Sequence, residues 1–150
     1  MSEHIFKRHN KTLLLYHMVF PVKYRRKAIS ESVEDTIIDV CNGISERYEI
    51  YFIEIGADEN HMHFLIQGIP TLSVEVIVRT VKSIIAKEVF KIHPEVKRIL
   101  WGGSFWTSGY YANTVGQYGN EEVIKKYLQQ QGTETEYKKF YKGQLKLFDF

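Results

Sequence analysis

The sequence has little cysteine, little proline and no long apolar run, and each shortage excludes a class of protein. Its 150 residues include one cysteine and three prolines. A single thiol cannot form an intrachain disulfide, which excludes a disulfide-stapled scaffold and indicates a reducing compartment. The longest apolar stretch, TLLLYHMVF, is too short to cross a bilayer, and the polar start MSEHIFKRHN lacks the apolar centre of a signal peptide. We therefore expect a cytoplasmic protein with no membrane partner.

A strong excess of one charge is also missing. The net charge is +2, which by itself does not argue for nucleic acid. What is present is a local concentration of cations around one ring, KYRRK, at residues 23–27. Aromatic residues reach 14%, and ten of them are tyrosines. Rings and cations together are suited to binding unpaired bases and phosphates. Considered one residue at a time, the cations are explained equally well by a solvated turn and the rings by an aromatic core.

The spacing of apolar residues predicts a single α+β domain. Strand-like segments cover residues 12–20, 49–57, 61–68 and 105–115. A first helix is capped by Ser30 or Ser32, and its apolar stripe runs from Val33 to Tyr48 with Cys41 as a packing thiol. A second helix covers residues 73–91 and ends before Pro94.

A third helix is expected at residues 121–131, between Asn120 as its cap and Gly132 as its stop. The complete order is therefore β-α-β-β-α-β followed by an extra helix. This is the ferredoxin-like arrangement, an antiparallel sheet with two helices on one face. The other face of the sheet is left open for function.

Two histidines, His61 and His63, stand at the start of the third expected strand. Side chains alternate along a strand, so both imidazoles share a face with Leu65 and Gln67, whereas the apolar residues between them face the helices. The two backbones are roughly 7 Å apart, so the imidazoles can converge on one divalent cation. Two ligands do not make a site, and a pair of plain surface histidines stays an alternative.

The last expected helix offers partners for these histidines. Tyr127 and Gln131 are four residues apart on its apolar stripe, so they lie one above the other. A glutamine on an inward stripe must find polar partners or cost about 1–3 kcal/mol. If this helix covers the open face of the sheet, it brings both side chains toward His61 and His63.

The resulting set of two imidazoles, an amide and a phenol suggests phosphodiester chemistry. Imidazole nitrogens and an amide oxygen suit Mg²⁺ or Mn²⁺ better than a closed zinc site. A cation at this place can polarise a phosphodiester, and Tyr127 can attack the phosphorus atom and become covalently linked. The phenol has a pKa of about 10 and needs a proton acceptor, which the sequence does not identify.

These residues resemble the single-tyrosine HUH transposases, the small insertion-sequence transposases that act on single-stranded DNA, with the REP-associated tyrosine transposases as relatives. The segments that carry the resemblance are YHMVFPVKYRRKAI, ADENHMHFLIQG, LWGGSFWTSGYYANTVG and VIKKYLQQQ. They span about residues 12–131, so the core of the single domain 1–150 would lie there, with residues 133–150 as a tail. One departure is Asn60, where members of the family often carry an acid.

The resemblance implies a function and a set of site residues. His61, His63 and Gln131 would hold Mg²⁺ or Mn²⁺, and Tyr127 would form a 5′-phosphotyrosine while a 3′-hydroxyl is released. The substrate would be single-stranded DNA with subterminal hairpins, and the active site of a homodimer could be shared between its subunits. Phosphate contacts are expected from the KYRRK loop and from the second helix, namely Lys23, Tyr24, Arg25, Arg26, Lys27, Lys82, Lys87 and Lys91.

Three other functions are compatible with the same residues. The chain could be a binding module for structured single-stranded DNA or RNA that has lost its chemistry. It could be a metal-dependent hydrolase of a small phosphodiester, with Tyr127 as a structural residue. A replication initiator or relaxase of the HUH type would normally be larger and carry further domains.

Overall fold

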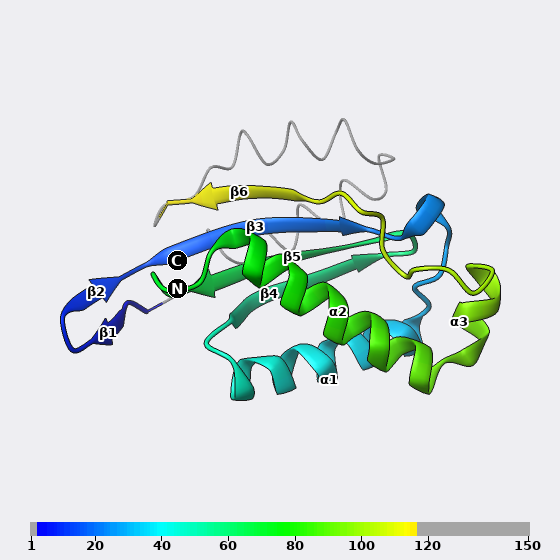
Figure 1. The fold of residues 1–150 in the computed structure, drawn as a ribbon, viewed down its shortest axis with the longest axis horizontal. Coiled ribbons are helices and arrows are strands. Elements are labelled where there is room, and N and C mark those ends of the chain that lie inside the picture. Colours follow the sequence, from blue (N-terminus) through cyan, green and yellow to red (C-terminus); the bar gives the residue numbers. More distant parts are fainter. Residues whose placement is uncertain (1–2, 117–150) are drawn as a thin grey trace.

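A four-stranded antiparallel sheet with the order β4-β5-β3-β6 packs on two helices in the computed structural model, which describes residues 3–116 (Figure 1). The strands are β3 (Leu14–Pro21), β4 (Tyr51–Asp58), β5 (His61–Gly68) and β6 (Tyr111–Val115), and the helices are α1 (Glu31–Arg47) and α2 (Val74–Ile92). Both helices lie on the same side of the sheet (Figure 1). The ferredoxin-like prediction is thus confirmed, while the expected helix 121–131 and the tail 133–150 lie outside the described residues.

The helices begin and end at residues that favour helix termini. Ser30 caps α1 and Ser73 caps α2, and each hydroxyl accepts a hydrogen bond from the backbone N–H three residues later. The apolar stripe of α1 is shorter than predicted, because Tyr48 is an exposed C-cap residue and not a buried one. The backbone of α2 stops at His93, where Pro94 opens the short helix α3 (Pro94–Ile99).

One apolar core fills the space between the sheet and the two helices. Phe20 and Phe64 are fully buried at its centre, and their ring centroids lie 5.3 Å apart. Cys41 is also fully buried, which confirms it as a packing thiol, and burial raises the pKa of this thiol above its ordinary value. A buried and protonated thiol is a poor nucleophile, so Cys41 contributes to packing and not to chemistry.

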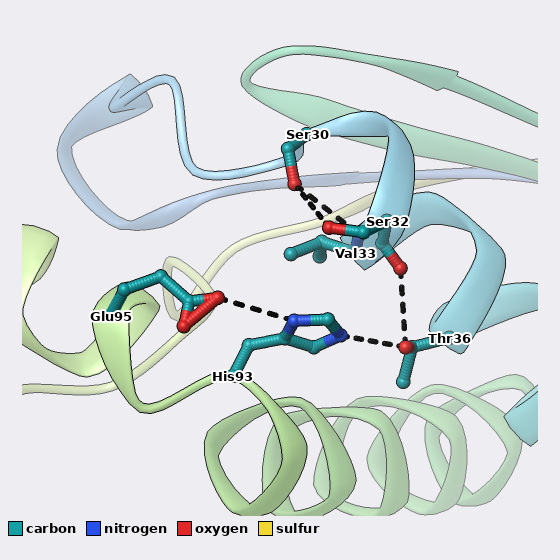
Figure 2. A network of polar contacts seen from close by, with 6 residues as sticks. All are labelled: Ser30, Ser32, Val33, Thr36, His93 and Glu95. Carbon is teal, nitrogen blue, oxygen red and sulfur yellow. Dashed lines mark hydrogen bonds and ion pairs between the residues drawn. The ribbon is translucent and has the colours of Figure 1, made fainter.

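A polar network ties the start of α1 to the corner between α2 and α3 (Figure 2). The Nε2 atom of His93 lies 2.7 Å from Thr36 Oγ1, and its Nδ1 atom lies 3.2 Å from a carboxylate oxygen of Glu95. The Thr36 hydroxyl also donates to the carbonyl of Ser32. The imidazole of His93 therefore joins α1 to α3, although Thr36 and His93 are 57 residues apart in the chain.

Four elements were absent from the sequence-based prediction. They are the hairpin of β1 (Ile5–Lys7) and β2 (Asn10–Thr12), the 3₁₀ turn η1 (Lys23–Arg25), and α3. The last predicted strand is shorter than expected, since residues 105–110 pair with the sheet only through an isolated bridge between Trp106 and Val22. Phe105 and Trp106 are aromatic and therefore suggest a strand, but they lie in a loop and their side chains pack in the core. Among residues 3–116, no helix is long and apolar enough to span a membrane.

Candidate functional site

The candidate site lies on the face of the sheet that points away from α1 and α2. Strand register places His61 and His63 of β5 on this face beside Pro21 and Val19 of β3, so their shared face is as predicted. Neither α1 nor α2 covers this face, as predicted, and the helix 121–131 that was expected to cover it lies outside the described residues. Only 7% of His61 and 2% of His63 is exposed, and the face has its own buried apolar cluster, formed by Leu15, Val19, Leu65 and Val115. Both faces of β5 are therefore buried.

Asn60 sets the orientation of His61. Its side-chain oxygen Oδ1 lies 2.9 Å from His61 Nδ1. Because an amide oxygen can only accept, this contact favours the tautomer that carries the proton on Nδ1. A hydrogen bond of this kind is what orients imidazoles that bind metals. The departure at Asn60 therefore preserves the orienting contact, although an amide raises the basicity of the ring less than a carboxylate would.

Gly56 of β4 provides the space for His63. The two residues are register partners across β4 and β5. A Cβ atom added at Gly56 would lie 1.7 Å from His63 Nε2 and 2.2 Å from its Cε1, far inside any van der Waals contact. The imidazole of His63 thus lies over the bare backbone of β4, and a side chain at residue 56 would exclude it.

His17 of β3 lies beside His63 on the side away from β4. Its ring centroid lies 5.9 Å from that of His63, and the planes are tilted by 44°. His17 is fully buried, and this burial lowers the pKa of its imidazole to about 3. The ring is therefore neutral at physiological pH. The sequence does not reveal this contact, because His63 lies 46 residues later in the chain and comes close to His17 only when β3 pairs with β5.

Imidazole nitrogens are suitable ligands for a divalent cation, and His61 and His63 would supply two of them. Within residues 3–116, no group of three His, Cys, Asp or Glu side chains could hold a metal ion by itself. Gln67 shares the same face, but its side-chain N–H donates to the backbone carbonyl of Glu3 at 2.7 Å. The remaining predicted partners, Gln131 and Tyr127, lie outside the described residues.

The basic loop lies at the same end of the sheet as His61. Pro21 is the register partner of His61, and the N–H of Val22 donates to the carbonyl of Asn60 at 2.9 Å. The KYRRK residues that follow form η1 and its exit, with Tyr24, Arg25 and Lys27 exposed. The exposed cations of the KYRRK loop therefore follow directly after the residues of β3 that pair with His61.

The lysines of α2 differ in what they contact. Lys82 donates from Nζ to the carbonyls of Thr107 and Gly109, both at 2.8 Å, and partial burial lowers the pKa of its ammonium group. Lys87 and Lys91 are exposed and carry no comparable contact with the described residues. Lys82 thus orders the loop beside it, whereas the role of all three lysines in DNA binding stays a prediction.

The chain matches a known family over most of its length. Residues 10–131 match the family described as "Transposase IS200 like". The chain is 29% identical over 118 residues to the ISDra2 transposase TnpA of Deinococcus radiodurans, which covers 79% of this chain and 84% of that protein. It is 26% identical over 123 residues to the transposase for insertion sequence element IS200 of Salmonella typhimurium, which covers 82% of this chain and 80% of that protein. The protein is a transposase, and it belongs to the IS200-like family.

Two solved structures share the fold. A structure described as a putative transposase from Deinococcus radiodurans superposes with a TM-score of 0.73 at 23% identity, covering 86% of this chain and 98% of that one. A REP-associated tyrosine transposase, solved bound to a REP hairpin, superposes with a TM-score of 0.52 at 10% identity, covering 85% of this chain and 68% of that one. At these identities the two structures support the architecture of the sheet and helices.

Proposed function

We propose that this transposase cleaves and rejoins single-stranded DNA at hairpin-marked element ends through a covalent 5′-phosphotyrosine at Tyr127. The observation that carries the proposal is the pair of imidazoles on one face of β5, with His61 oriented by Asn60 and His63 held over Gly56. The relative solved on a REP hairpin supports a hairpin-bearing substrate. Together with family membership, these features favour an active enzyme over a binding module.

His61, His63 and Gln131 would hold Mg²⁺ or Mn²⁺, which when bound would neutralise charge on the scissile phosphate. The phenol oxygen of Tyr127 would attack phosphorus, and the bond from phosphorus to the 3′ oxygen would break. The fragment on the 3′ side of the break would then be linked to tyrosine through its 5′ phosphate, and the fragment on the 5′ side would end in a 3′-hydroxyl. Attack of a 3′-hydroxyl on the phosphotyrosine would rejoin DNA and release the phenol, so no nucleotide cofactor is required.

A covalent adduct is the direct test. Single-stranded oligonucleotides from the DNA flanking the coding sequence, each containing a predicted hairpin, are incubated with the full chain and Mn²⁺ and separated under denaturing conditions. An adduct is expected with the native chain and with Tyr48→Phe, which removes an exposed phenol at the end of α1. No adduct is expected with Tyr127→Phe, His61→Ala or His63→Ala. An adduct that persists in Tyr127→Phe would refute the assignment of the nucleophile.

We further propose a homodimer in which the tyrosine of one subunit completes the histidine site of the other. Complementation separates this arrangement from one within a single subunit. Tyr127→Phe and His61→Ala chains are each inactive alone, but a mixed dimer contains one intact pair only if the site is shared between subunits. Adduct formation on mixing is therefore expected, and its absence in a verified mixed dimer would place both groups in the same subunit.

A further inference from the structure

A groove of about 340 Å³ lies between α1 and α2, which run side by side along the sheet (Figure 1). Its apolar lining includes Val40 of α1 and Ile84 and Ile92 of α2, which are half-buried or exposed, whereas the residues of both helices that face the sheet are buried. Tyr48, which also lines the groove, is 44% exposed, and Ile92 is 55% exposed. Two large exposed apolar side chains beside one hollow indicate a surface that another segment covers.

The same groove carries acids. Asp39 of α1 and Glu88 of α2 line it, and neither carboxylate forms an ion pair with the described residues. The lining also includes a cation, Arg47, but α1 as a whole contains five acids and one base. Negative charge of this kind repels phosphates, so the groove is unsuited to DNA and favours a basic segment with apolar side chains.

One segment of the chain has the complementary composition. Residues 137–150, YKKFYKGQLKLFDF, lie outside the described residues. They contain four lysines against one aspartate, together with seven tyrosine, phenylalanine or leucine residues. We call residues 137–150 the basic tail. Its lysines match the acids of the groove, and its rings and leucines match the apolar lining.

The basic tail follows the described chain at a distance from which it can reach the groove. Strand register aligns Val115 of β6 with Tyr51 of β4, through Leu15 and Gln67. β6 therefore ends at the end of the sheet where β4 begins, directly after α1, and three strand spacings make this distance about 15 Å. Residues 117–136, even with the eleven expected helical residues among them, span up to about 45 Å.

We propose that the basic tail docks in the groove between α1 and α2 of its own chain, with lysines beside Asp39 and Glu88 and apolar side chains against Ile84 and Ile92. Only nine residues separate Tyr127 from the basic tail. Docking therefore tethers the segment that carries Tyr127 to the helices on the opposite side of the sheet from His61. It requires neither DNA nor a metal ion, so it is independent of the proposed function.

A spin label on the full chain tests this docking in the absence of DNA and metal. A nitroxide is attached to the basic tail through Gln144→Cys in ¹⁵N-labelled protein, and Cys41 escapes labelling because it is fully buried. The amide signals of Val40 and Ile84 are expected to lose intensity relative to the same sample with the nitroxide reduced. The signal of Leu15, on the other face of the sheet, should keep its intensity.

Charge variants show whether the groove itself is recognised. Asp39→Lys combined with Glu88→Lys should restore the signals of the groove residues. Lys142→Glu combined with Lys146→Glu should do the same, and this pair leaves the described fold untouched. The matched control is Glu46→Lys, since Glu46 is an exposed acid of α1 that does not line the groove. This control should keep the loss of intensity.

Three results would overturn the proposal. The first is an absence of intensity loss in the groove, or a loss at Leu15 and Leu65 in its place. The second is equal restoration by Glu46→Lys and by the groove variants. The third is a loss seen only when ¹⁵N-labelled chains without the nitroxide are mixed with unenriched chains that carry it, because the tail would then come from another subunit. Failure of the phosphotyrosine mechanism would leave all these measurements intact.

Discussion

The imidazole of His63 occupies the place where a side chain at residue 56 would begin. A Cβ atom at Gly56 would lie 1.7 Å from His63 Nε2, and His63 is only 2% exposed, so the ring has little space into which to move. The glycine is therefore part of the candidate metal site although it bears no ligand. It acts by leaving a gap in β4 that the ring fills.

Gly56→Ala should displace His63 and weaken Mn²⁺ binding at least tenfold, with a loss of about 1–3 kcal/mol in the free energy of unfolding. Calorimetric titration of Mn²⁺ and chemical denaturation measure the two effects. The control is Gly43→Ala in the interior of α1, where an added Cβ atom meets nothing within 4 Å. That change should stabilise the protein by up to about 1 kcal/mol and leave metal binding alone. Unaltered Mn²⁺ affinity in Gly56→Ala would remove His63 from the site.

Asn60 should control metal affinity through His61, whose Nδ1 it binds at 2.9 Å. Asn60→Ala removes this orientation and should lower Mn²⁺ affinity about 10- to 100-fold, the usual cost of losing such a partner. Asn60→Asp keeps an acceptor and adds charge, so it should match or exceed the native affinity. Comparable losses in both variants would show that the side chain supports the turn and not the imidazole.

His17 should make stability depend on pH. Below about pH 6.5 the unfolded chain binds a proton at this residue, whereas the folded chain does so only near pH 3 because burial lowers the pKa. The free energy of unfolding should therefore fall as the pH is lowered through this window, by up to about 1.4 kcal/mol for each pH unit. Denaturation series in EDTA, which exclude metal effects, should show a shallower slope for His17→Gln. Parallel slopes would mean that His17 is accessible to protons in the folded chain.

Thr36 should contribute to stability through His93. Thr36→Val conserves shape but removes the 2.7 Å hydrogen bond to a mostly buried imidazole, so we expect a loss of about 1–2 kcal/mol (Figure 2). Thr80→Val is the control, since Thr80 is half-buried on α2 and its hydroxyl makes no hydrogen bond with the described residues. It should change stability by less than about 0.5 kcal/mol. Equal losses in denaturant titrations of the two variants would show that the network does not join the helices.

Local patterns predicted most of the fold. The strand at His61–Gly68 was predicted with its observed bounds, and Ser30 and Ser73 lie where the helices begin. The prediction was less accurate where residues typical of strands lie in backbone that does not pair as a strand. Residues 105–110 are aromatic enough to suggest a strand, yet the strand begins only at Tyr111. The positive φ angles of Tyr24, Arg25 and Trp101 could not be predicted from residue propensities either.

The sequence by itself determined that His61 and His63 share a face, because alternation along one strand is local geometry. Only the tertiary structure decided what surrounds them. Gly56 comes from β4 and His17 from β3, and both reach His63 through a register that depends on long-range strand pairing. Every residue of β5 is buried, so the two imidazoles lie in an enclosed part of the sheet, a property that depends on tertiary packing and not on alternation along one strand.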